Sequence, residues 1–339
     1  MQKAFAVIAL FIFLINLSCK KNPVEPNDKL NNRNYIWKID TLKINEGIAL
    51  PSFMWGTDPD NLWAVGYAFS NKYCIWYYNG VKWNNYQPDK YVDPWGIYGF
   101  AKNDIWMGSS DGFIRHYNEI KWSRFFDVKI PGFAAFVTQG ISGSAPDDIF
   151  AVGYADTIDG HSYKPIIAHY DGTQWRLIDT PLRKESFAQI FYIKDENKYL
   201  LKSWIFNSPE QMIYLFDGQK LEKIFTVPAA DLCIGSIGEN VYITSDSKIY
   251  KYNEGTLTFF KAFPDSQFVG RVWGRNENDF FCLNVEGIGH YNGSNLITIF
   301  KKANNDWTLN EAIVFEKEVF FIWDESMQHK TVIVHGKLK

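Results

Sequence analysis

The sequence predicts an all-β protein built from repeated four-stranded antiparallel sheets, and two observations support this prediction. The first is composition: Phe, Trp and Tyr make up 17% of the 339 residues, and aromatic side chains suit the half-buried surface of a pleated sheet. The second is a recurring phrase, found as "DPDNLWAVG" from Asp58, "AKNDIWMGS" from Ala101 and "APDDIFAVG" from Ala145. A phrase that recurs every few tens of residues indicates a chain made of equivalent structural units.

Each unit carries an aromatic marker in a predicted second strand. The markers lie 39 to 49 residues apart, and an Asp, Asn or Glu stands two residues before each of them. They are Trp63, Trp106, Phe150, Tyr199, Tyr242, Phe281 and Phe320. A polar turn precedes the acidic or amide residue, and in five copies a glycine stands before that turn, so each copy predicts a first strand, a turn and a second strand.

A second phrase follows each marker and predicts the remainder of the unit. It reads "YYNGVKW", "HYNEIKW" and "HYDGTQW" in the first three copies. The Asn-Gly or Asp-Gly pair, replaced by Asn-Glu in the second copy, predicts a tight hairpin between a third and a fourth strand, which begins at the Trp. Four short antiparallel strands that repeat about every 43 residues indicate a β-propeller blade, so seven markers predict a seven-bladed β-propeller.

The two ends of the chain are predicted to meet in the last blade. The segment "NYIWKIDTL" (34–42) precedes the first blade and resembles a fourth strand, and the C-terminal copy lacks that strand. We therefore expect residues 35–42 to complete the last blade beside residues 310–338. The predicted propeller domain spans residues 35–339, and its ring is closed by this N-terminal strand.

Residues 1–18 are predicted to be a signal peptide. Lys3 precedes an apolar stretch of about 14 residues, shorter than the roughly 20 that a membrane span needs. The stretch ends at Ser18 and Cys19 and resembles a bacterial lipoprotein signal, although Asn16 stands where that family prefers Leu. The resemblance implies lipidation of Cys19, and the alternative is an ordinary secretory signal with a chance cysteine. Residues 19–34 are polar and rich in Pro and Asn, which favours a flexible tether.

The repeat pattern also resembles known propellers. With its WG, D-I/L-W/F-AVG and HYDG-x-x-W elements, it is similar to the repeats of bacterial exported proteins and of tectonin, kelch and Asp-box propellers. The likeness covers residues 35–338. The Gly-Gly doublet of kelch repeats is missing, and Asp171 stands directly before Gly172, whereas Asp-box repeats place Asp two residues before Gly. The resemblance therefore implies the fold far more specifically than any activity.

Several function classes find no support in the sequence. A net charge of −3 argues against nucleic acid as a partner. His116, His169 and His290 occupy equivalent places in different blades, so we expect structural histidines there and no metal site. Asp104, Asp148 and Asp279 also follow the repeat and are expected to form turns. We predict no cofactor and no catalysis.

Three cysteines follow Cys19, and their spacing matches no metal motif. Cys74, Cys233 and Cys282 have apolar surroundings, so free buried thiols are expected. Repeat phasing leaves Cys233 with Cys282 as the one pair that could form a disulfide.

Aromatic residues that break the repeat gather in two kinds of connection, namely those between second and third strands and those between blades. In a propeller both kinds emerge on the same face. The candidate binding residues there are Phe69, Tyr91, Trp95, Phe133, Phe136, Tyr163, Trp204 and Phe206. Aromatic side chains on a rigid scaffold are typical of binding surfaces for proteins or sugars. The alternative is that these rings form small local cores above the ring of blades.

The combined pattern predicts a non-catalytic protein-binding or scaffolding module of a bacterial cell envelope. Acyl chains on Cys19 would hold it at the outer membrane, facing the periplasm or the cell surface, and its partner would be another envelope protein. A carbohydrate-binding, lectin-like propeller is the first alternative. A glycosidase or lyase that uses the central channel is the second, and it requires two titratable groups close together at one channel mouth.

Overall fold

The computed structural model describes most of the predicted propeller. The described residues are 34–42, 49–68, 75–86, 92–160, 162–181, 183–228, 232–264, 268–302, 307–325 and 330–339. The predicted signal peptide, Cys19, Cys74, Phe69 and Tyr91 lie outside them. The described part contains 28 strands, and we find in it no helix with the length and hydropathy of a membrane span. An all-β fold, as predicted, is therefore confirmed.

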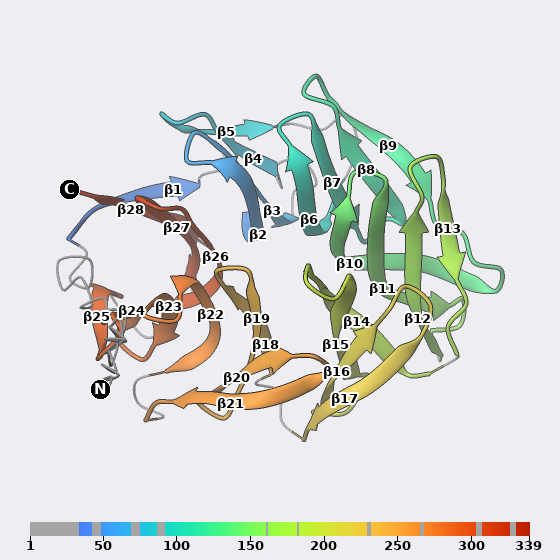
Figure 1. The fold of residues 1–339 in the computed structure, drawn as a ribbon. Helices are drawn as coiled ribbons and strands as arrows, with labels where there is room; N and C mark the ends of the chain where they lie inside the picture. The colour runs from blue at the N-terminus through green and yellow to red at the C-terminus, as the bar shows by residue number, and fades with distance from the viewer. Residues whose placement is uncertain are drawn as a thin grey trace, which may run out of the picture.

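The strands are grouped in sets of four that follow one another around a ring (Figure 1). Blade one contains β2 (Ala49–Asp58), β3 (Asn61–Ala68), β4 (Ile75–Tyr78) and β5 (Trp83–Tyr86). Blade two contains β6 (Pro94–Ala101), β7 (Asp104–Ser109), β8 (Phe113–Tyr117) and β9 (Trp122–Asp127). Blade three contains β10 (Phe133–Ala145), β11 (Asp148–Thr157), β12 (Tyr163–Tyr170) and β13 (Trp175–Ile178).

The second half of the ring follows the same order. Blade four contains β14 (Glu185–Ile193), β15 (Lys198–Ile205), β16 (Gln211–Phe216) and β17 (Leu221–Val227). Blade five contains β18 (Cys233–Ile237), β19 (Asn240–Ser245), β20 (Lys248–Asn253) and β21 (Thr256–Ala262). Blade six contains β22 (Val269–Asn276), β23 (Asp279–Asn284), β24 (Gly287–Tyr291) and β25 (Leu296–Lys301). Blade seven contains β26 (Trp307–Val314), β27 (Glu318–Glu325), β28 (Lys330–Leu338) and β1 (Tyr35–Leu42).

Within each blade the strands pair antiparallel in the order predicted, and the described strands are consistent with seven blades. Blades five and six are joined into one eight-stranded sheet because their first strands also pair in parallel, with Ser236 opposite Trp273 and Ile237 opposite Gly274. A Cβ on Gly235 would lie 2.2 Å from the carbonyl oxygen of Val272, so glycine at this position permits the close approach of the two inner strands.

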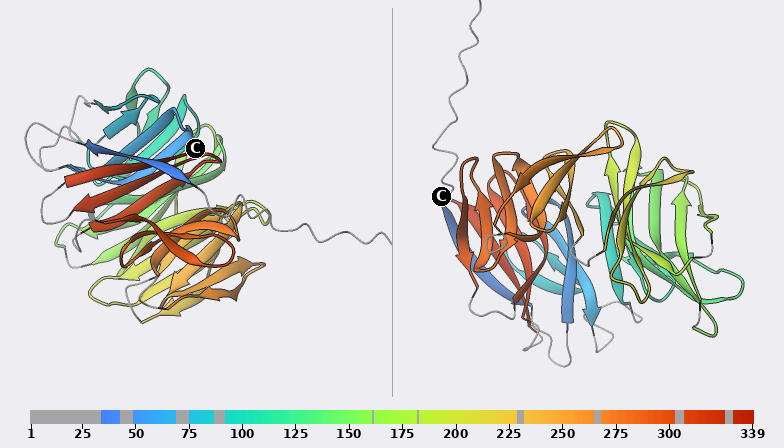
Figure 2. Two further views of the ribbon diagram at one scale, coloured as in Figure 1. Left: turned by 90° about the vertical axis from the view of Figure 1, so that its left-hand side faces the viewer. Right: turned by 90° about the horizontal axis from the view of Figure 1, so that it is seen from below.

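The N-terminal strand closes the ring as the sequence predicts. β1 pairs antiparallel with β28, from Tyr35 opposite Leu338 to Leu42 opposite Thr331, and Figure 2 shows the two strands side by side. Trp37 lies opposite Gly336, just as Trp122 lies opposite Tyr117 in blade two. A Cβ on Gly336 would come within 2.5 Å of the Trp37 ring. Gly336 thus replaces the tyrosine or phenylalanine of the other copies and leaves room for the closing tryptophan.

The hydrophobic core lies between neighbouring blades. Trp63 of blade one is 2% exposed, and its ring centroid lies 4.8 Å from that of Tyr117 and 5.5 Å from that of Trp122, both in blade two. Phe281 of blade six is fully buried, with its ring 5.6 Å from Phe321 in blade seven. These aromatic markers therefore fill interfaces between neighbouring blades, where burial of large apolar side chains stabilises the ring.

Candidate functional site

Hydrogen bonds between connections define one face of the ring. Ser110 N, after the second strand of blade two, donates to Asp93 O at the entrance of that blade, at 3.0 Å. Phe206 N, after the second strand of blade four, donates to Lys184 O, which precedes the blade's first strand, at 2.9 Å. The connections between second and third strands thus lie beside the connections between blades. We call this side the connection face.

Three of the predicted aromatic residues come together on this face. Tyr163 stacks on Phe206 with ring centroids 3.6 Å apart, and Trp204 lies 4.3 Å from Phe206. Tyr154, which the sequence analysis missed, lies 5.0 Å from Phe206 and completes the group. All four rings are half-buried. We call Tyr154, Tyr163, Trp204 and Phe206 the aromatic cluster.

The aromatic cluster joins two neighbouring blades. Tyr154 and Tyr163 belong to β11 and β12 of blade three, and Trp204 belongs to β15 of blade four. Strands extend further toward this face than the sequence indicated, so three of the four rings stand on strands. Phe206 alone stands in a turn, and its backbone is tied to Lys184. The rings are therefore held by hydrogen-bonded backbone.

Phe136 does not belong to the binding surface, which corrects the prediction. Its side chain is 1% exposed and packs in the core formed with Ile141, Ile149 and Trp106. The reason is that β10 begins at Phe133, so residues 133–139 form part of a 13-residue strand paired with β11 and are not a free connection. Phe133 is half-buried against the same core.

Trp95 lies half-buried at the start of β6. Its indole Nε1 donates to Asp93 Oδ2 at 3.1 Å, and the Ser110 hydroxyl donates to the same oxygen at 2.8 Å. Asp93 is 6% exposed, and its other carboxylate oxygen is buried without a hydrogen-bond partner among the described residues. A buried acid thereby orients Trp95 at the connection face. The spacing of aromatic residues in the sequence gave no information about this acid.

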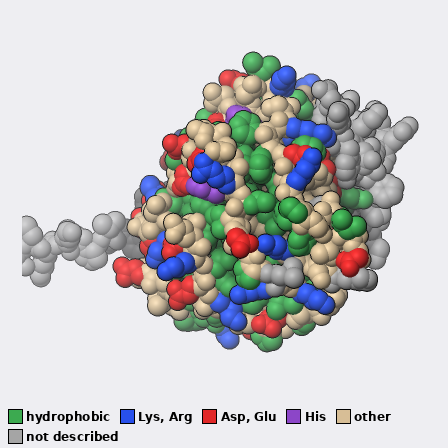
Figure 3. All heavy atoms as spheres, turned by 90° about the vertical axis from the view of Figure 1, so that its right-hand side faces the viewer, with side chains coloured by type: hydrophobic (Ala, Val, Ile, Leu, Met, Phe, Trp, Pro, Cys, Tyr) green, Lys and Arg blue, Asp and Glu red, His purple; other side chains and the backbone are tan. Residues whose placement is uncertain are grey.

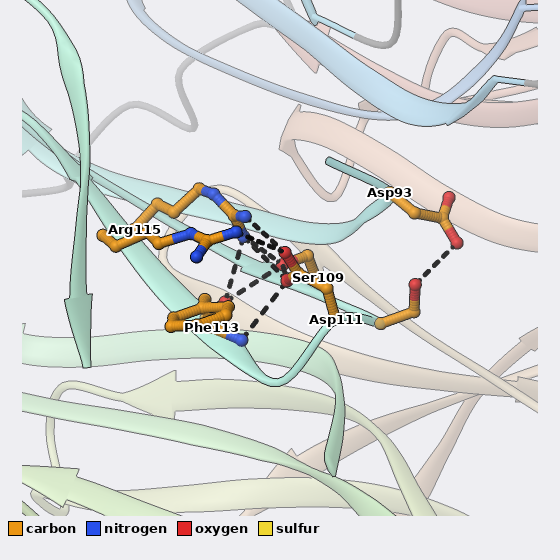
Figure 4. A network of polar contacts seen from close by, with 7 residues as sticks. Asp93, Ser109, Asp111, Phe113 and Arg115 are labelled. Carbon is orange, nitrogen blue, oxygen red and sulfur yellow. Dashed lines mark hydrogen bonds and ion pairs between the residues drawn. The ribbon is translucent and has the colours of Figure 1, made fainter. Parts of the chain in front are cut away.

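A buried ion pair stiffens the neighbouring turn of blade two (Figure 4). The Arg115 guanidinium is 4% exposed and donates to both carboxylate oxygens of Asp111 and to the Ser109 hydroxyl. Burial would raise the pKa of Asp111, but these hydrogen bonds from Arg115 and Ser109 outweigh it and hold the pKa below its usual range. A cavity of about 530 Å³ lies between this turn and residues 127–136.

The second hollow is the central channel, a cavity of about 400 Å³ at the middle of the ring. All seven first strands contribute to its wall. Six aromatic side chains line it, namely Phe53, Trp55, Tyr98, Phe191, Tyr192 and Trp273. The channel wall also contains the amides Gln139 and Gln189 and the charged pair Arg271 and Glu311.

Arg271 and Glu311 hold one another across blades six and seven. Arg271 Nη1 donates to Glu311 Oε2 at 2.7 Å, and the Trp273 indole donates to Glu311 Oε1 at 2.7 Å. The two charged side chains are 14% and 18% exposed. Burial would lower the pKa of Arg271, but the Glu311 carboxylate outweighs it and raises the pKa, so the guanidinium stays charged.

The repeated histidines pair with the repeated acids inside single blades. His116 lies 2.8 Å from Asp104, His169 lies 2.7 Å from Asp148 and His290 lies 2.8 Å from Asp279. In blade seven His335 is paired in the same way with Glu318, at 2.7 Å. The acids therefore bind histidine across two strands, and Asp148 and Asp279 also accept hydrogen bonds across the preceding turn, from Ser144 and Arg275.

One signal in the sequence could have found these pairs. The copies with an acid two residues before the marker also have a histidine in the third strand, and the copies with Asn61, Asn197 or Asn240 have none. Each histidine also packs on the marker of its own blade; His169, for example, stacks on Phe150 at 4.3 Å. In the described part of the chain, no group of three or more His, Cys, Asp or Glu side chains could hold a metal ion.

The described cysteines do not form the disulfide that repeat phasing left open. Cys233 and Cys282 are both free thiols. Cys282 is buried, and this burial raises the pKa of its thiol. The thiol of Cys282 is thus unreactive at neutral pH.

Solved structures similar to this chain are β-propellers. YCF48 bound to D1 peptide is 14% identical with a TM-score of 0.59, and the match covers 89% of this chain and 97% of YCF48. YCF48 from Cyanidioschyzon merolae is 10% identical with a TM-score of 0.58, over 88% of this chain and 98% of the other. The WD40 domain of Neurospora crassa Pan2 is 10% identical with a TM-score of 0.58, over 85% and 89%.

No protein-family model matches the chain, and no curated protein matches it either. At identities this low the structural likeness establishes the propeller fold alone.

Proposed function

We propose that this chain is a non-catalytic protein-binding propeller, held at the bacterial envelope by acyl chains on Cys19. The observation that carries the proposal is the aromatic cluster, in which four half-buried rings from two blades are fixed on one face. Tyr and Trp on a rigid scaffold dominate the energetics of protein interfaces because they bury a large area at little cost in conformational entropy.

Two further features support a protein partner. YCF48, a propeller of the same overall fold, is known in a complex with a D1 peptide. The outer side of blades two to four carries charged side chains of both signs among hydrophobic ones (Figure 3), so it presents no strong single-sign field that would favour a polyanionic partner. We propose that the connection face binds a segment of another envelope protein, with the aromatic cluster as its anchor.

The absence of catalysis is part of the proposal. The Glu311 carboxylate accepts hydrogen bonds from Arg271 and Trp273 with both of its oxygens, so it is poorly placed to act as a general base. An enzyme of the glycosidase class needs two carboxyl groups across the substrate. Among the residues that line the channel, Glu311 is the one carboxylate.

Capture of partners from detergent-solubilised envelopes tests the proposal. The bait is the full mature chain, compared with the double variant Trp204→Ala/Phe206→Ala and with Phe259→Ala, an aromatic residue 62% exposed on β21 of blade five. We expect a partner protein that is captured by the wild type and by Phe259→Ala and lost with the double variant. Capture unchanged by the double variant, with all three baits folded by circular dichroism, would contradict the proposed anchor.

A glycan array with the same three proteins tests the main alternative, which is a lectin-like function. Sugar binding that requires Trp204 and Phe206, without any captured protein, would support the lectin-like function and overturn the protein-binding one.

Lipid anchoring is tested independently. Cells grown with an alkyne fatty acid should label the wild-type chain and not the Cys19→Ser variant, and the variant should leave the membrane fraction. Equal labelling of both would show that the anchor at Cys19 is wrong.

A further inference from the structure

The central channel has the dimensions and the wall of a small-molecule site, and the protein-binding proposal leaves it without a role. Its volume of about 400 Å³ falls in the usual range for small-ligand pockets, roughly 300 to 1,000 Å³. The wall combines aromatic faces with a few polar groups, as such pockets do. The larger polar side chains of the wall are Gln139, Gln189, Arg271 and Glu311, and with Ser142 and Ser236 they come from the inner strands of five blades.

A repeated β-bulge accounts for two of the polar side chains in this wall, those of Gln139 and Arg271, whereas Gln189 and Glu311 stand at paired positions next to a bulge. In six inner strands the pairing with the second strand is interrupted near the same point, and the residues left unpaired there are Ser52, Trp95, Gln139, Ala188, Gly270 with Arg271, and Asn310. A bulge leaves its extra residue out of the ladder and redirects its side chain. Gln139, Ala188 and Arg271 are bulge residues that line the channel.

The bulge is repeated in the backbone, but its side chain differs in every copy. The aromatic markers, in contrast, are large rings in all seven blades, because packing between blades needs them. A position that is fixed in backbone and varied in chemistry contributes little to folding. Three such positions, Gln139, Ala188 and Arg271, line one cavity, where they can instead provide specific contacts to a ligand.

Hydrogen-bonding groups in the channel remain available to a ligand. The buried Oε1 atom of Gln189 has no hydrogen-bond partner among the described residues. An unsatisfied buried acceptor costs free energy, which a ligand donor would recover. Arg271 uses Nη1 for Glu311, and no described side chain or backbone oxygen is bonded to its Nε or Nη2. The wall thus offers the free donor groups of Arg271 directly, and it offers the Gln189 acceptor once that buried amide oxygen turns toward the channel.

The charges of the channel cancel. Arg271 and Glu311 are the two charged residues of its wall and form an ion pair at 2.7 Å. An ionic ligand would therefore lose hydration without gaining a net opposite charge. A neutral molecule with many hydroxyls and with apolar C–H faces avoids this cost. Its hydroxyls match the amide, guanidinium and carboxylate groups, and its C–H faces match rings such as Trp273 and Tyr98.

We infer that the central channel is a binding site for a neutral saccharide of one or two sugar units. Arg271, Glu311 and Gln189 contact its hydroxyls, and the aromatic wall contacts the faces of its rings. The site is separate from the aromatic cluster, which belongs to strand ends and connections at the rim.

Ligand-observed NMR and calorimetry on the mature protein test this inference. The probes are glucose, galactose, N-acetylglucosamine, maltose, cellobiose and N,N′-diacetylchitobiose, with glucuronic acid and glucosamine as charged counterparts. We expect at least one neutral sugar to bind with saturation below about 10 mM and to bind more tightly than its charged counterpart. Tryptophan fluorescence should change on binding because Trp55 and Trp273 line the channel.

Two matched variants locate the site. Gln189→Leu removes the unpartnered amide from the channel, and Gln211→Leu removes an amide whose Oε1 is equally buried and unpartnered but lies on β16, outside the channel wall. Neither change removes a satisfied hydrogen bond of that oxygen, so both proteins should fold. We expect Gln189→Leu to raise the dissociation constant for the sugar about tenfold and Gln211→Leu to leave it unchanged.

Three results would overturn the inference: saturation by none of the neutral sugars, tighter binding of glucuronic acid or glucosamine than of neutral sugars, or equal effects of Gln189→Leu and Gln211→Leu. The Trp204→Ala/Phe206→Ala variant should keep the sugar affinity of the wild type. Failure to capture a partner would therefore contradict the proposed function without affecting the channel site. Failure to bind any sugar would contradict the channel site without affecting the proposed partner surface.

Discussion

In the interior of the blades the same contacts recur from copy to copy, whereas at the inner-strand bulges the same backbone feature carries a different side chain each time. Four blades contain an acid–histidine pair beneath an aromatic marker. The bulges carry serine, tryptophan, glutamine, alanine, arginine or asparagine. The difference indicates which positions the fold needs and which positions are free to meet other molecules. Residues in the blade interior and residues at the bulges or on the surface should therefore respond differently to substitution.

The largest expected effect is a loss of stability from the blade interior. Phe281→Ala removes a fully buried ring that packs on His290 and Phe321, and it should lower the free energy of unfolding by about 3–5 kcal/mol. Phe259→Ala, at the exposed outer edge of blade five, should change it by less than about 0.5 kcal/mol. Urea denaturation followed by circular dichroism measures both. Similar losses would break the distinction between interior and surface aromatics.

A buried acid beside one bulge should make stability depend on pH. Asp324 is 8% exposed, and burial raises its pKa to about 6 from 3.8 despite hydrogen bonds from Thr331 and from the bulge residue Asn310. Between these pH values the folded protein holds a proton that the unfolded chain has lost. Stability should therefore fall by about 3 kcal/mol as the pH rises from about 4 to above 6.

The variant Asp324→Asn isolates this contribution because its side chain does not titrate. The difference in unfolding free energy between variant and wild type should shift in favour of the variant between pH 4 and pH 7. A difference that stays constant with pH would show that Asp324 keeps an ordinary pKa. A shift would show that Asp324, which lies beside the bulge at Asn310, is not optimised for stability, as residues near binding sites often are not.

The features that repeat could be predicted from the sequence because each of them occurs in several copies of the unit along the chain. The markers gave the strand order, and the unmatched segment around Trp37 gave the closure with β28. The acid–histidine pairs were missed although their signal was present, because acids and histidines were considered separately.

The bulges and the aromatic cluster could not be predicted in the same way. A bulge adds one residue to a strand without changing its composition, so no spacing rule reveals it. Phe136 was placed on the surface because the unusual length of β10 is set by pairing with β11. Tyr154 was missed because it directly follows the repeated phrase that ends at Gly153, and its packing on Phe206 depends on the neighbouring blade.

A substitution in the closing strand's partner has a smaller expected effect. In Gly336→Ala the new Cβ would meet the Trp37 ring at 2.5 Å, so the indole must shift against Phe300 and Phe321. We expect a loss of about 1–3 kcal/mol from overpacking. The matched change Gly132→Ala, in a connection where a Cβ meets nothing within 4 Å, controls for added bulk, although its positive φ of 84° adds backbone strain. Denaturation of both proteins compares the two costs. No loss of stability in Gly336→Ala would mean that the packing between β1 and β28 is looser than the packing inside the other blades.

The smallest expected effect is a coupling energy inside the aromatic cluster, and it is measured together with the single-variant costs that distinguish a binding surface from a local core. Tyr163 and Phe206 stack at 3.6 Å with an angle of 9° between their ring planes, so a double-mutant cycle with Tyr163→Ala and Phe206→Ala should give a coupling energy of about 0.5–1.5 kcal/mol. If the cluster were a local core, each single variant would also cost several kcal/mol, as Phe281→Ala does. A binding surface predicts the opposite: single variants that cost no more than about 1 kcal/mol in stability and yet abolish partner capture. Because the four rings are half-buried and stand on strands or, for Phe206, on a turn whose backbone is already hydrogen-bonded, the frame that holds them does not depend on them. Single-variant costs close to that of Phe281→Ala would therefore assign the cluster to the core and remove it from the connection face as an anchor.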